Sequence, residues 1–411
     1  MNETARIVIV GAGHAGGTAA ALLRQHGHTG PILLIGEEPV VPYQRPPLSK
    51  AYLKGETDAE ALKLRPDAFY AESHIALRMG ARAEAIDRSA RRVRLQGGED
   101  LAYDILILAT GSANRTVHFE GERPGDLHAL RTLADAERLK TIVGAGRRLV
   151  IVGGGYIGLE AAASARALGA EATVVELEPR VLARVACEEL SAFFEAYHRN
   201  RGVEILAGAQ VVAVERGPDG VLAGVRLADG RQVACDGVLT GVGAAARAEL
   251  ARDCGLDCDP GIVVDHAGRT SDPRIFAIGD VTLRPLHHYG DRRHRLESVS
   301  NAVEQARQAT AAILGQPAPA HEVPWFWSDQ YELKLQIAGM PFDADARVIR
   351  GAMEDASFAI FHLKHGRVVA VEAVNRPPEF MAGRQLIAQG RTVDAAMLAD
   401  PAVSMREVAR G

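Results

Sequence analysis

The stretch IVIVGAGHAG, residues 7–16, decides how this chain folds. Its four apolar residues predict a buried strand, and the glycine-rich run after them predicts a tight turn. The next segment, TAAALLRQHG (18–27), has the apolar periodicity of a helix, and ILLIGE (32–37) predicts a second buried strand. Together these segments predict a βαβ unit of an α/β fold.

Three glycines in the first turn have the spacing of a phosphate-binding loop. In Gly11-x-Gly13-x-x-Gly16 the first glycine permits the turn, the second lets the backbone approach a pyrophosphate, and the third lets helix and strand pack closely. The free N–H groups at the start of the helix would hold the phosphate. Glu37, at the end of the second strand, would accept hydrogen bonds from ribose hydroxyls. We therefore expect a bound dinucleotide at this loop.

The same order of elements recurs in the middle of the chain. RLVIV (148–152) leads into GGGYIG (153–158), then a helical segment, then the strand ATVVELE (172–178). The residues expected to bind a second dinucleotide there are Gly153, Gly155, Gly158 and Glu176. This approximate duplication predicts two different dinucleotides in one chain, one of which passes electrons to the other.

Glu176 also bears on which nicotinamide cofactor binds. A carboxylate about 4 Å from a 2′-phosphate costs roughly 4 kcal/mol per unit charge at an effective dielectric constant of about 20. That repulsion outweighs modest help from Arg180 or Arg184. The sequence therefore favours NADH over NADPH.

Composition excludes several classes of protein. With 47% hydrophobic and 24% charged residues, the 411-residue chain has the make-up of a globular protein of two or three domains. A net charge of −5 argues against nucleic acid as the main ligand. We see no secretory signal at the start of the chain and no apolar run long enough to span a membrane. We therefore expect a cytoplasmic protein without a membrane partner.

The four cysteines do not form a recognisable metal or redox motif. They are Cys187, Cys235, Cys254 and Cys258, and none has a His or Cys partner at zinc-binding spacing. We expect unpaired structural thiols and no resident metal.

The remaining segments predict further sheets. YDILILATGS (103–112) and PRIFAIGD (273–280) have the pattern of buried strands that end in turns. GQPAPAHEVP (315–324) is proline-rich and predicts a linker. Beyond it, LKLQIAG, ARVIRGA, SFAIFHL and RVVAVEAV predict successive antiparallel strands, and two helical stretches close the chain.

Several motifs together resemble one protein family. They are GAGHAG, PYQRPPLSKAYL, LATG, VGGGYIGLE, FAIGDV, ESVSNAVEQA and PWFWSDQYELKLQIAG. They resemble the FAD-dependent NADH:ferredoxin reductases of cytochrome P450 and ring-hydroxylating oxygenase systems, the putidaredoxin reductase-like branch of the glutathione-reductase-like flavoproteins. The likeness covers nearly the whole chain.

The resemblance implies two Rossmann-like dinucleotide-binding domains and a C-terminal α+β domain with an antiparallel sheet. The FAD-binding domain would be discontinuous and comprise residues 1–112 and 242–320. Residues 113–241 would form the NADH-binding domain, and residues 321–411 the C-terminal domain.

PYQRPPLSK (42–50) separates this chain from the disulfide reductases of the same superfamily. In those enzymes the helix at this point carries a CxxxxC pair that takes electrons from the flavin. This chain has Pro46, Pro47, Leu48, Ser49 and Lys50 there. Without a dithiol, the electrons must leave the flavin directly, and an iron–sulfur protein that accepts one electron is the natural acceptor.

The resemblance also implies roles for individual residues. Lys50 would lie near the reactive edge of the flavin and pair with Glu160, and a cation there would influence the redox potential. Tyr156 would cover the flavin and move aside for nicotinamide, and Trp327 would cover the flavin on the side of the protein partner. The other residues matched to FAD contacts are Ala15, Arg45, Ala83, Arg131, Asp280 and Val299.

A basic loop, RPLHHYGDRRHR (284–295), suggests a docking surface. Together with a later arginine it would offer a positive rim to an acidic [2Fe–2S] ferredoxin, because opposite charges steer association. The residues of this rim are Arg292, Arg293, Arg295 and Arg307. We expect a monomer, as the family mostly is.

Two other functions remain open from the sequence. One is an NADH oxidase or quinone reductase, in which oxygen or a quinone takes the electrons. The other is a redox-sensing flavoprotein similar to apoptosis-inducing factor. The chain also departs from the family where a proline-asparagine pair is often found, because it has GVGAAARAELA (241–251) instead.

Overall fold

The computed structural model describes residues 4–410, so the first three residues, on which the expectation of no signal partly rests, lie outside it. The chain divides into two compact units. Unit 1 comprises Met1–Gln44, Leu62–Ala113 and Ala245–Phe326, and unit 2 comprises Arg45–Ala61, Asn114–Ala244 and Trp327–Gly411. Two of the points at which the chain passes from one unit to the other lie in the short strands β8 (Ser112–Asn114) and β17 (Ala244–Ala246).

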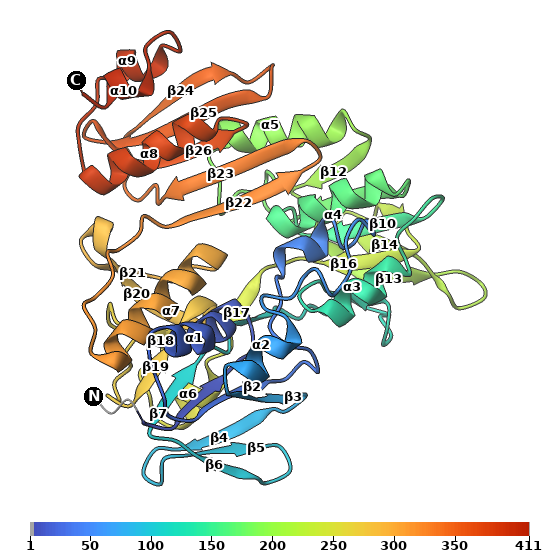
Figure 1. Ribbon diagram of the computed structural model, residues 1–411. Coiled ribbons are helices and arrows are strands. Elements are labelled where there is room, and N and C mark those ends of the chain that lie inside the picture. The colour runs from blue at the N-terminus through green and yellow to red at the C-terminus, as the bar shows by residue number, and fades with distance from the viewer. Residues whose placement is uncertain (1–3, 411) are drawn as a thin grey trace. The chain divides into compact units, whose positions relative to one another are not determined.

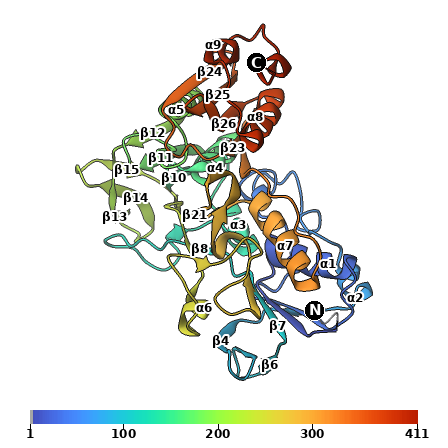
Figure 2. The same ribbon diagram turned by 90° about the vertical axis from the view of Figure 1, so that its left-hand side faces the viewer.

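Unit 1 is built on a parallel five-stranded sheet in the order β19-β7-β1-β2-β3. Its strands are β1 (Ile7–Val10), β2 (Ile32–Gly36), β3 (Ile75–Met79), β7 (Ile105–Leu108) and β19 (Ile275–Ala277). Helices α1 (His14–Gln25) and α7 (Val299–Leu314) lie side by side in Figures 1 and 2. Both pack on the sheet face that carries Ile7, Ile9 and Ile107.

The opposite face of this sheet is covered by smaller elements. Val8, Val10 and Leu106 pack there against a three-stranded antiparallel sheet and a short helix. These elements are β4 (Ala83–Asp87), β5 (Arg92–Leu95), β6 (Asp100–Ala102) and α6 (Glu249–Asp253). The remaining elements of unit 1 are α2 (Asp67–Glu72), β18 (Ile262–Val263), η2 (Gly279–Val281), β20 (Thr282–Leu286), η3 (His287–Tyr289) and β21 (Arg292–His294). Because alternate residues of β1 enter opposite cores, the strand is apolar throughout.

Unit 2 contains a second parallel sheet, in the order β12-β11-β10-β16-β9. Its strands are β9 (Leu127–His128), β10 (Arg148–Val152), β11 (Glu171–Glu176), β12 (Val203–Ala207) and β16 (Gly237–Thr240). The antiparallel meander β13 (Val211–Arg216), β14 (Leu222–Leu227) and β15 (Gln232–Ala234) packs on it through a shared apolar core. The helices of this part are η1 (Pro46–Ser49), α3 (Leu133–Lys140), α4 (Tyr156–Ala167) and α5 (Glu188–Arg199).

A five-stranded sheet in the order β22-β23-β26-β25-β24 completes unit 2. Its strands are β22 (Trp325–Gln330), β23 (Leu333–Gly339), β24 (Ala346–Ala352), β25 (Ser357–Lys364) and β26 (Arg367–Val374). Helix α8 (Pro377–Gln389) lies across it, with Gly383 against Val371 (Figure 1). The four predicted strands after the linker are therefore confirmed. Three helices end the chain rather than two, because α9 (Ala395–Ala399) and α10 (Met405–Val408) are separate, with caps at Asp394 and Ser404.

The predicted fold class is confirmed by the two parallel sheets and the C-terminal antiparallel sheet. The contact-based units follow other boundaries than the three domains expected from the sequence, because residues 45–61 group with unit 2. The three-domain division stays a prediction. None of the helices between residues 4 and 410 has the length and apolar character needed to cross a lipid bilayer.

Candidate dinucleotide-binding and active site

The first glycine loop connects β1 to α1, and two of its glycines are required by packing. Gly11 has φ +114°, and a Cβ atom there would lie 2.1 Å from the carbonyl oxygen of Ala109. A Cβ atom on Gly16 would lie 1.9 Å from the carbonyl oxygen of Gly11. Both contacts are far inside van der Waals distance, so the turn and the close helix–strand packing need glycine irrespective of any ligand.

The second glycine of each loop has a different reason to be glycine. Gly13 and Gly155, the N-cap residues of α1 and α4, have φ −85° and −78°, which any residue adopts. A Cβ atom on either would meet no atom of the described residues within 4 Å. Neither the backbone nor a neighbour therefore demands glycine at these positions. The open space in front of two helix N-termini fits a pyrophosphate that approaches the backbone closely.

Glu37 follows β2 at the carboxyl edge of the sheet in unit 1, and two arginines hold it. Its Oε2 accepts a hydrogen bond from Arg247 Nη1 at 2.6 Å, and its Oε1 accepts one from Arg82 Nη1 at 3.2 Å. The Arg247 guanidinium lowers the pKa of the Glu37 carboxyl group, with a smaller contribution from Arg82. Glu37, Arg82 and Ala83 line a cavity of about 550 Å³. An ionised acceptor thus lies beside a cavity large enough for a nucleoside.

The turn after β19 lies against the start of α1. Gly279 has φ +80°, and a Cβ atom on it would lie 2.9 Å from the Cβ atom of Ala15. Its N–H donates to Gln305 Oε1 at 2.8 Å, which ties the turn to α7. Asp280 is the next residue in this turn, and Val299 is the first residue of α7. In unit 1, the turn that contains Asp280 therefore lies next to Ala15 at the carboxyl end of the sheet.

The second glycine loop, in unit 2, repeats this construction between β10 and α4. Gly153 has φ +111°, and a Cβ atom there would lie 2.5 Å from the carbonyl oxygen of Gly241. A Cβ atom on Gly158 would lie 2.1 Å from the carbonyl oxygen of Gly153. The first and third glycines of both loops therefore have no room for a side chain.

Glu176, at the end of β11, is held by backbone groups rather than by arginines. Its Oε2 accepts a hydrogen bond from the N–H of Gly154 at 2.5 Å, and its Oε1 accepts one from the N–H of Glu178 at 2.8 Å. Backbone donors carry no full charge, so the carboxylate keeps its negative field toward the loop. The arrangement places an acid that is held by backbone N–H groups beside the second phosphate-binding loop.

Unit 2 contains an ion pair between the partly buried Lys50 and the buried Glu160. Lys50 Nζ lies 2.6 Å from Glu160 Oε2, and Glu160 is only 5% exposed. Ser49 Oγ also donates to Glu160 Oε2, at 2.5 Å, and Ser328 Oγ donates to Glu160 Oε1, at 2.6 Å. Each carboxylate oxygen thus has a donor, as a buried charge requires. The ion pair expected from the resemblance is present, and it holds the Lys50 ammonium group in one place.

The hydrogen bonds continue from Ser328 into the core. Gln330 Nε2 donates to Ser328 Oγ at 3.1 Å, and Gln330 Oε1 lies 2.8 Å from Nε2 of His198 on α5. Burial lowers the pKa of His198 to about 4, so this imidazole is neutral at pH 7. The chain from Lys50 to His198 therefore contains one buried ion pair and no second full charge.

The other predicted contacts in unit 2 lie in several elements. Arg45 Nη1 donates to the carbonyl oxygen of Arg131 at 2.5 Å, so these two residues are brought together. Tyr156 is the first residue of α4, and its hydroxyl group donates to the carbonyl oxygen of Val185 at 3.2 Å. Burial raises the pKa of Tyr156 well above its usual value, which keeps the phenol protonated. Trp327 lies half-buried in β22.

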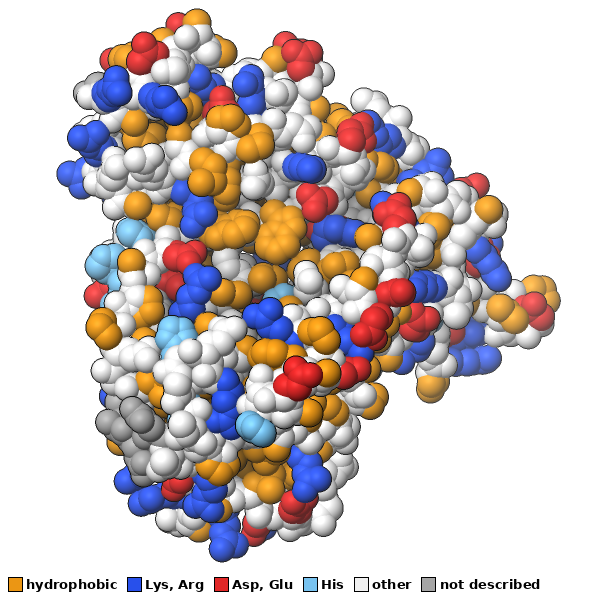
Figure 3. All heavy atoms as spheres, viewed as in Figure 1, with side chains coloured by type: hydrophobic (Ala, Val, Ile, Leu, Met, Phe, Trp, Pro, Cys, Tyr) orange, Lys and Arg blue, Asp and Glu red, His pale blue; other side chains and the backbone are white. Residues whose placement is uncertain are grey.

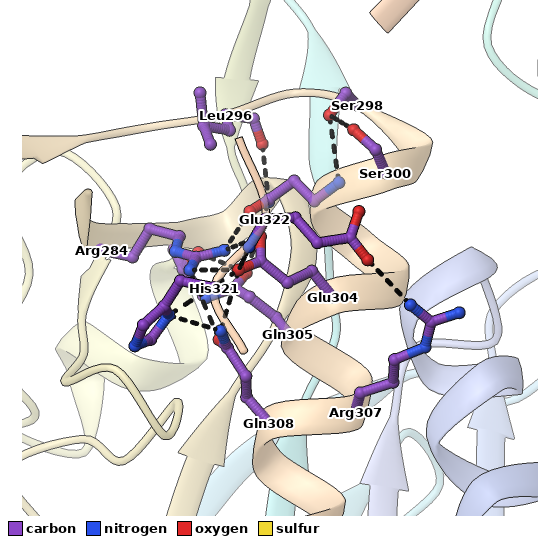
Figure 4. Close-up of polar contacts among 12 residues, drawn as sticks. Arg284, Leu296, Ser298, Ser300, Glu304, Gln305, Arg307, Gln308, His321 and Glu322 are labelled. Atoms are coloured by element: carbon purple, nitrogen blue, oxygen red, sulfur yellow. Dashed lines mark hydrogen bonds and ion pairs between the residues drawn. The ribbon is translucent and has the colours of Figure 1, made fainter. Parts of the chain in front are cut away.

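The four arginines of the predicted docking rim differ in their surroundings. Arg292 and Arg293 are exposed in β21. Arg295 forms an ion pair with Glu297, and Arg307 Nη1 lies 2.9 Å from Glu322 Oε1 (Figure 4). Figure 3 shows Lys and Arg side chains interspersed with Asp and Glu side chains over the face that it draws. The charges of Arg295 and Arg307 are therefore compensated within the chain.

Beside this surface, a buried polar network joins β20 to α7. Arg284 is 3% exposed, and its Nη1 lies 2.9 Å from Glu304 Oε2. Gln308 Nε2 donates to Glu304 Oε1 at 2.9 Å and lies 3.0 Å from His321 Nδ1 (Figure 4). Because both charges are paired and hydrogen-bonded, this network is a structural link between strand and helix.

Sequence reasoning missed four residues of these sites: Ser49, Arg82, Arg247 and Ser328. Arg247 lies in the segment where the chain departs from the family pattern, which was the available signal. Ser49 and Ser328 lie inside the quoted motifs, but their common acceptor, Glu160, is more than 100 positions away in the sequence. No local pattern reports such a contact.

Each of the two parallel sheets has a glycine loop with free space in front of its second glycine. Each also has an acid at the end of its second strand. These two repeated sites define a protein that binds two dinucleotides. The family model described as pyridine nucleotide-disulphide oxidoreductase matches residues 5–306, and a reductase C-terminal model matches residues 325–409. The chain belongs to the pyridine nucleotide-disulphide oxidoreductase family, so the resemblance expected from the sequence is confirmed. Membership implies FAD and NAD(P)H as cofactors.

Relatives and solved structures agree over the full length. The chain is 50% identical over 409 residues to the probable ferredoxin reductase CtmF of Castellaniella defragrans, covering 100% of each. It is 43% identical to the rhodocoxin reductase of Rhodococcus erythropolis, covering 93% of this chain and 89% of the relative. The crystal structure of the covalent putidaredoxin reductase–putidaredoxin complex contains a chain that matches with a TM-score of 0.96 and 40% identity, covering 100% of this chain and 99% of that one.

Proposed function

We propose that this protein is an NADH-dependent ferredoxin reductase, which takes hydride from NADH onto FAD and passes single electrons to a [2Fe–2S] ferredoxin of a cytochrome P450 or other oxygenase system. The observation that carries the proposal is the composition of η1. This helix contains Ser49 and no cysteine, and it is followed directly by Lys50, which pairs with Glu160 of α4; the four cysteines of the described residues are free. The full-length likeness to ferredoxin reductases supports the same acceptor.

When bound, FAD supplies the conversion between two-electron transfer from NADH and one-electron transfer to the acceptor. In unit 1 we assign its pyrophosphate to Gly11, Gly13, Gly16 and the N-terminus of α1, and its ribose to Glu37. The Arg247 and Arg82 contacts keep the Glu37 carboxylate ionised and therefore able to accept hydrogen bonds. The further FAD contacts proposed from the resemblance are Ala15, Arg45, Ala83, Arg131, Asp280, Val299 and Trp327.

We assign NADH to the second loop, through Gly153, Gly155, Gly158 and Glu176. The acid is fixed by the N–H groups of Gly154 and Glu178, so it has little freedom to withdraw from a 2′-phosphate. The repulsion is of the order of 4 kcal/mol for unit charges about 4 Å apart at an effective dielectric constant of about 20. NADH, whose ribose hydroxyl donates to a carboxylate, is the favoured donor.

Lys50 is proposed to stabilise negative charge on the reduced cofactor. Glu160 fixes the ammonium group, and Ser49 and Ser328 fix Glu160, so the cation needs no reorganisation when charge develops. Tyr156, the first residue of α4, donates its hydroxyl group to the carbonyl oxygen of Val185 at 3.2 Å, and from the resemblance we propose that it yields its position to nicotinamide.

The experiment that tests the function compares three acceptors with NADH as donor: ferricyanide, oxygen and a purified [2Fe–2S] ferredoxin. We expect the ferredoxin to be reduced faster than oxygen at equal concentration. Faster reduction of oxygen would identify an NADH oxidase instead. Ferricyanide serves as the control, because it reports flavin reduction without a docking step.

For the partner, we propose that the ferredoxin docks at Arg292 and Arg293 and that the reductase is a monomer. The exposed arginines would steer an acidic surface and make turnover sensitive to salt. The double change Arg292→Glu and Arg293→Glu should lower ferredoxin turnover and leave ferricyanide reduction unchanged. Arg91→Glu with Arg92→Glu, at the end of the β4–β5 connection and the exposed first position of β5, changes the net charge equally and should leave ferredoxin turnover unchanged. Equal losses with both acceptors would contradict this docking surface.

A further inference from the structure

A second group of chemically active side chains lies in unit 2, outside the Lys50–Glu160 site. Cys187, His362 and Glu372 are 8%, 4% and 3% exposed, and we call them the thiol cluster. Glu372 Oε2 lies 2.8 Å from Cys187 Sγ and 3.2 Å from His362 Nε2. The sulfur, nitrogen and carboxylate oxygen all lie within 4.8 Å of one another.

Rigid elements hold the three side chains. His362 on β25 and Glu372 on β26 belong to neighbouring antiparallel strands, in which Ile360 is the direct partner of Glu372. The register of this pair shifts at His362, and such an irregularity re-aims a side chain. Cys187 is the N-cap residue of α5, and its backbone N–H donates to Glu372 Oε1 at 3.2 Å. The cluster is thus preorganised by two strands and a helix start.

Without a cation, the cluster is electrostatically incomplete. Both oxygens of the Glu372 carboxylate accept hydrogen bonds from Cys187, one from its Sγ atom and one from its backbone N–H. His362 Nε2 is buried and makes no hydrogen bond within the described residues, although it lies 3.2 Å from the carboxylate. A buried carboxylate and a buried unsatisfied nitrogen both cost free energy. A cation bound here would give the imidazole nitrogen a partner and place positive charge beside the carboxylate.

We propose that Cys187, His362 and Glu372 form a binding site for a divalent cation of the zinc class. A thiolate, a carboxylate and a neutral imidazole carry two negative charges, so one divalent ion makes the buried site neutral. Zinc takes tetrahedral sets of sulfur, nitrogen and oxygen donors, whereas magnesium and calcium prefer oxygen alone. Three protein ligands leave one coordination position for water or another group.

The spacing of the ligands explains why the sequence predicted no metal. Cys187 lies far along the chain from the other two residues, and His362 and Glu372 are on different strands. Zinc motifs recognisable in sequence have ligands a few residues apart. Only the pairing of β25 with β26, and their contact with α5, brings this donor set together.

The site can be tested on the FAD-loaded protein, prepared without a histidine tag and freed of metal by a chelator. We expect titration with zinc chloride, followed by gel filtration and elemental analysis, to show one tightly bound zinc per chain and a released proton from Cys187. Cys187→Ser and Glu372→Gln should each weaken binding by at least the roughly 10- to 100-fold that loss of a residue orienting a ligand costs. The flavin spectrum of each variant shows whether it has folded.

Two controls decide whether the bound zinc lies in the thiol cluster. Cys235→Ala removes another buried cysteine, which packs in an apolar core, and should bind zinc normally. The ring centroids of His266 and His287 in unit 1 lie 4.6 Å and 4.7 Å from that of His321, so these histidines are an alternative place for a metal. Cobalt chloride serves as a second probe, because a cobalt–thiolate bond gives a charge-transfer band that a site of histidines alone lacks. We expect this band in the parent protein and its loss in Cys187→Ser. The proposal is overturned if no zinc binds at micromolar concentration, if both cluster variants bind like the parent, or if Cys235→Ala loses zinc as they do.

Discussion

The two glycine loops have the same construction but differ in what holds the acid after the second strand. Glu37 of unit 1 is exposed and forms ion pairs with Arg247 and Arg82. Glu176 of unit 2 accepts hydrogen bonds from two backbone N–H groups, one of them within its own glycine loop. The first acid is therefore charge-compensated, whereas the second is positioned but not neutralised. This difference suits one loop for a permanently bound cofactor and the other for selecting between NADH and NADPH.

The helices after the two loops also differ. Helix α1 buries only glycine and apolar residues, whereas α4 buries Glu160 among its apolar residues. Unit 2 therefore contains a buried charge that unit 1 lacks at the matching helix. Burying that carboxylate requires Lys50, Ser49 and Ser328, so the second copy of the fold has acquired a site in place of apolar packing.

The largest effect is expected within the first loop itself. Gly11→Ala should yield protein without flavin, because the new Cβ atom would lie 2.1 Å from a carbonyl oxygen in a left-handed turn. Gly13→Ala should fold with an unchanged melting temperature, because its Cβ atom meets no described neighbour, yet bind FAD about 2 kcal/mol, or roughly 30-fold, more weakly. Thermal unfolding without FAD and FAD titration measure both effects. Normal FAD affinity in Gly13→Ala would remove the argument for a pyrophosphate at this loop.

The next largest effect concerns cofactor choice. Glu176→Gln should reduce the preference for NADH over NADPH by about 100-fold, because it removes most of the charge repulsion. The comparison of kcat/KM for the two donors measures this preference. Glu37→Gln is the matched variant in the other loop and should leave the ratio unchanged. A similar change in both variants would show that the loops do not have separate tasks.

The pH dependence of stability should depend on His198. Its pKa in the folded protein, about 4, is below the unfolded value of about 6.5, so the unfolded chain takes up the proton first. Its contribution is therefore complete above pH 6.5 and is lost as pH falls, by about 2 kcal/mol between pH 7 and pH 5. Urea unfolding of the parent and of His198→Asn at both pH values measures the difference. Parallel losses in the two proteins would contradict a neutral buried histidine.

The smallest effect separates two buried serines in unit 2. Ser328→Ala should destabilise the protein by about 2 kcal/mol, because its hydroxyl group donates to the charged Glu160. Ser164→Ala should cost about 1 kcal/mol, because Ser164 donates to the neutral carbonyl oxygen of Ser49. Equal losses in urea unfolding would mean that Glu160 does not carry a full charge in the folded protein.

Local sequence was sufficient for the elements and for the chemistry of the loops. Gly11 and Gly153 were predicted as turns because strand and helix patterns flank them, and both have positive φ. The strands of the C-terminal sheet were predicted because their apolar runs are bounded by turn residues. Contacts between distant segments could not be predicted in this way. The hydrogen bonds from Arg247 to Glu37 and from Ser328 to Glu160 each join residues that are more than 160 positions apart.

By itself, the sequence determined that this protein has two dinucleotide-binding βαβ units, an acid at each, and no dithiol next to the proposed flavin site. These features follow from steric and periodic rules that act over a few residues. Only the tertiary structure decided which donors surround Glu160, what holds Glu37 and Glu176, and that Cys187, His362 and Glu372 meet. The reason is that a buried charge is stabilised by the donors that packed strands and helices bring within about 3 Å of it. These donors can come from residues that are far apart in the sequence.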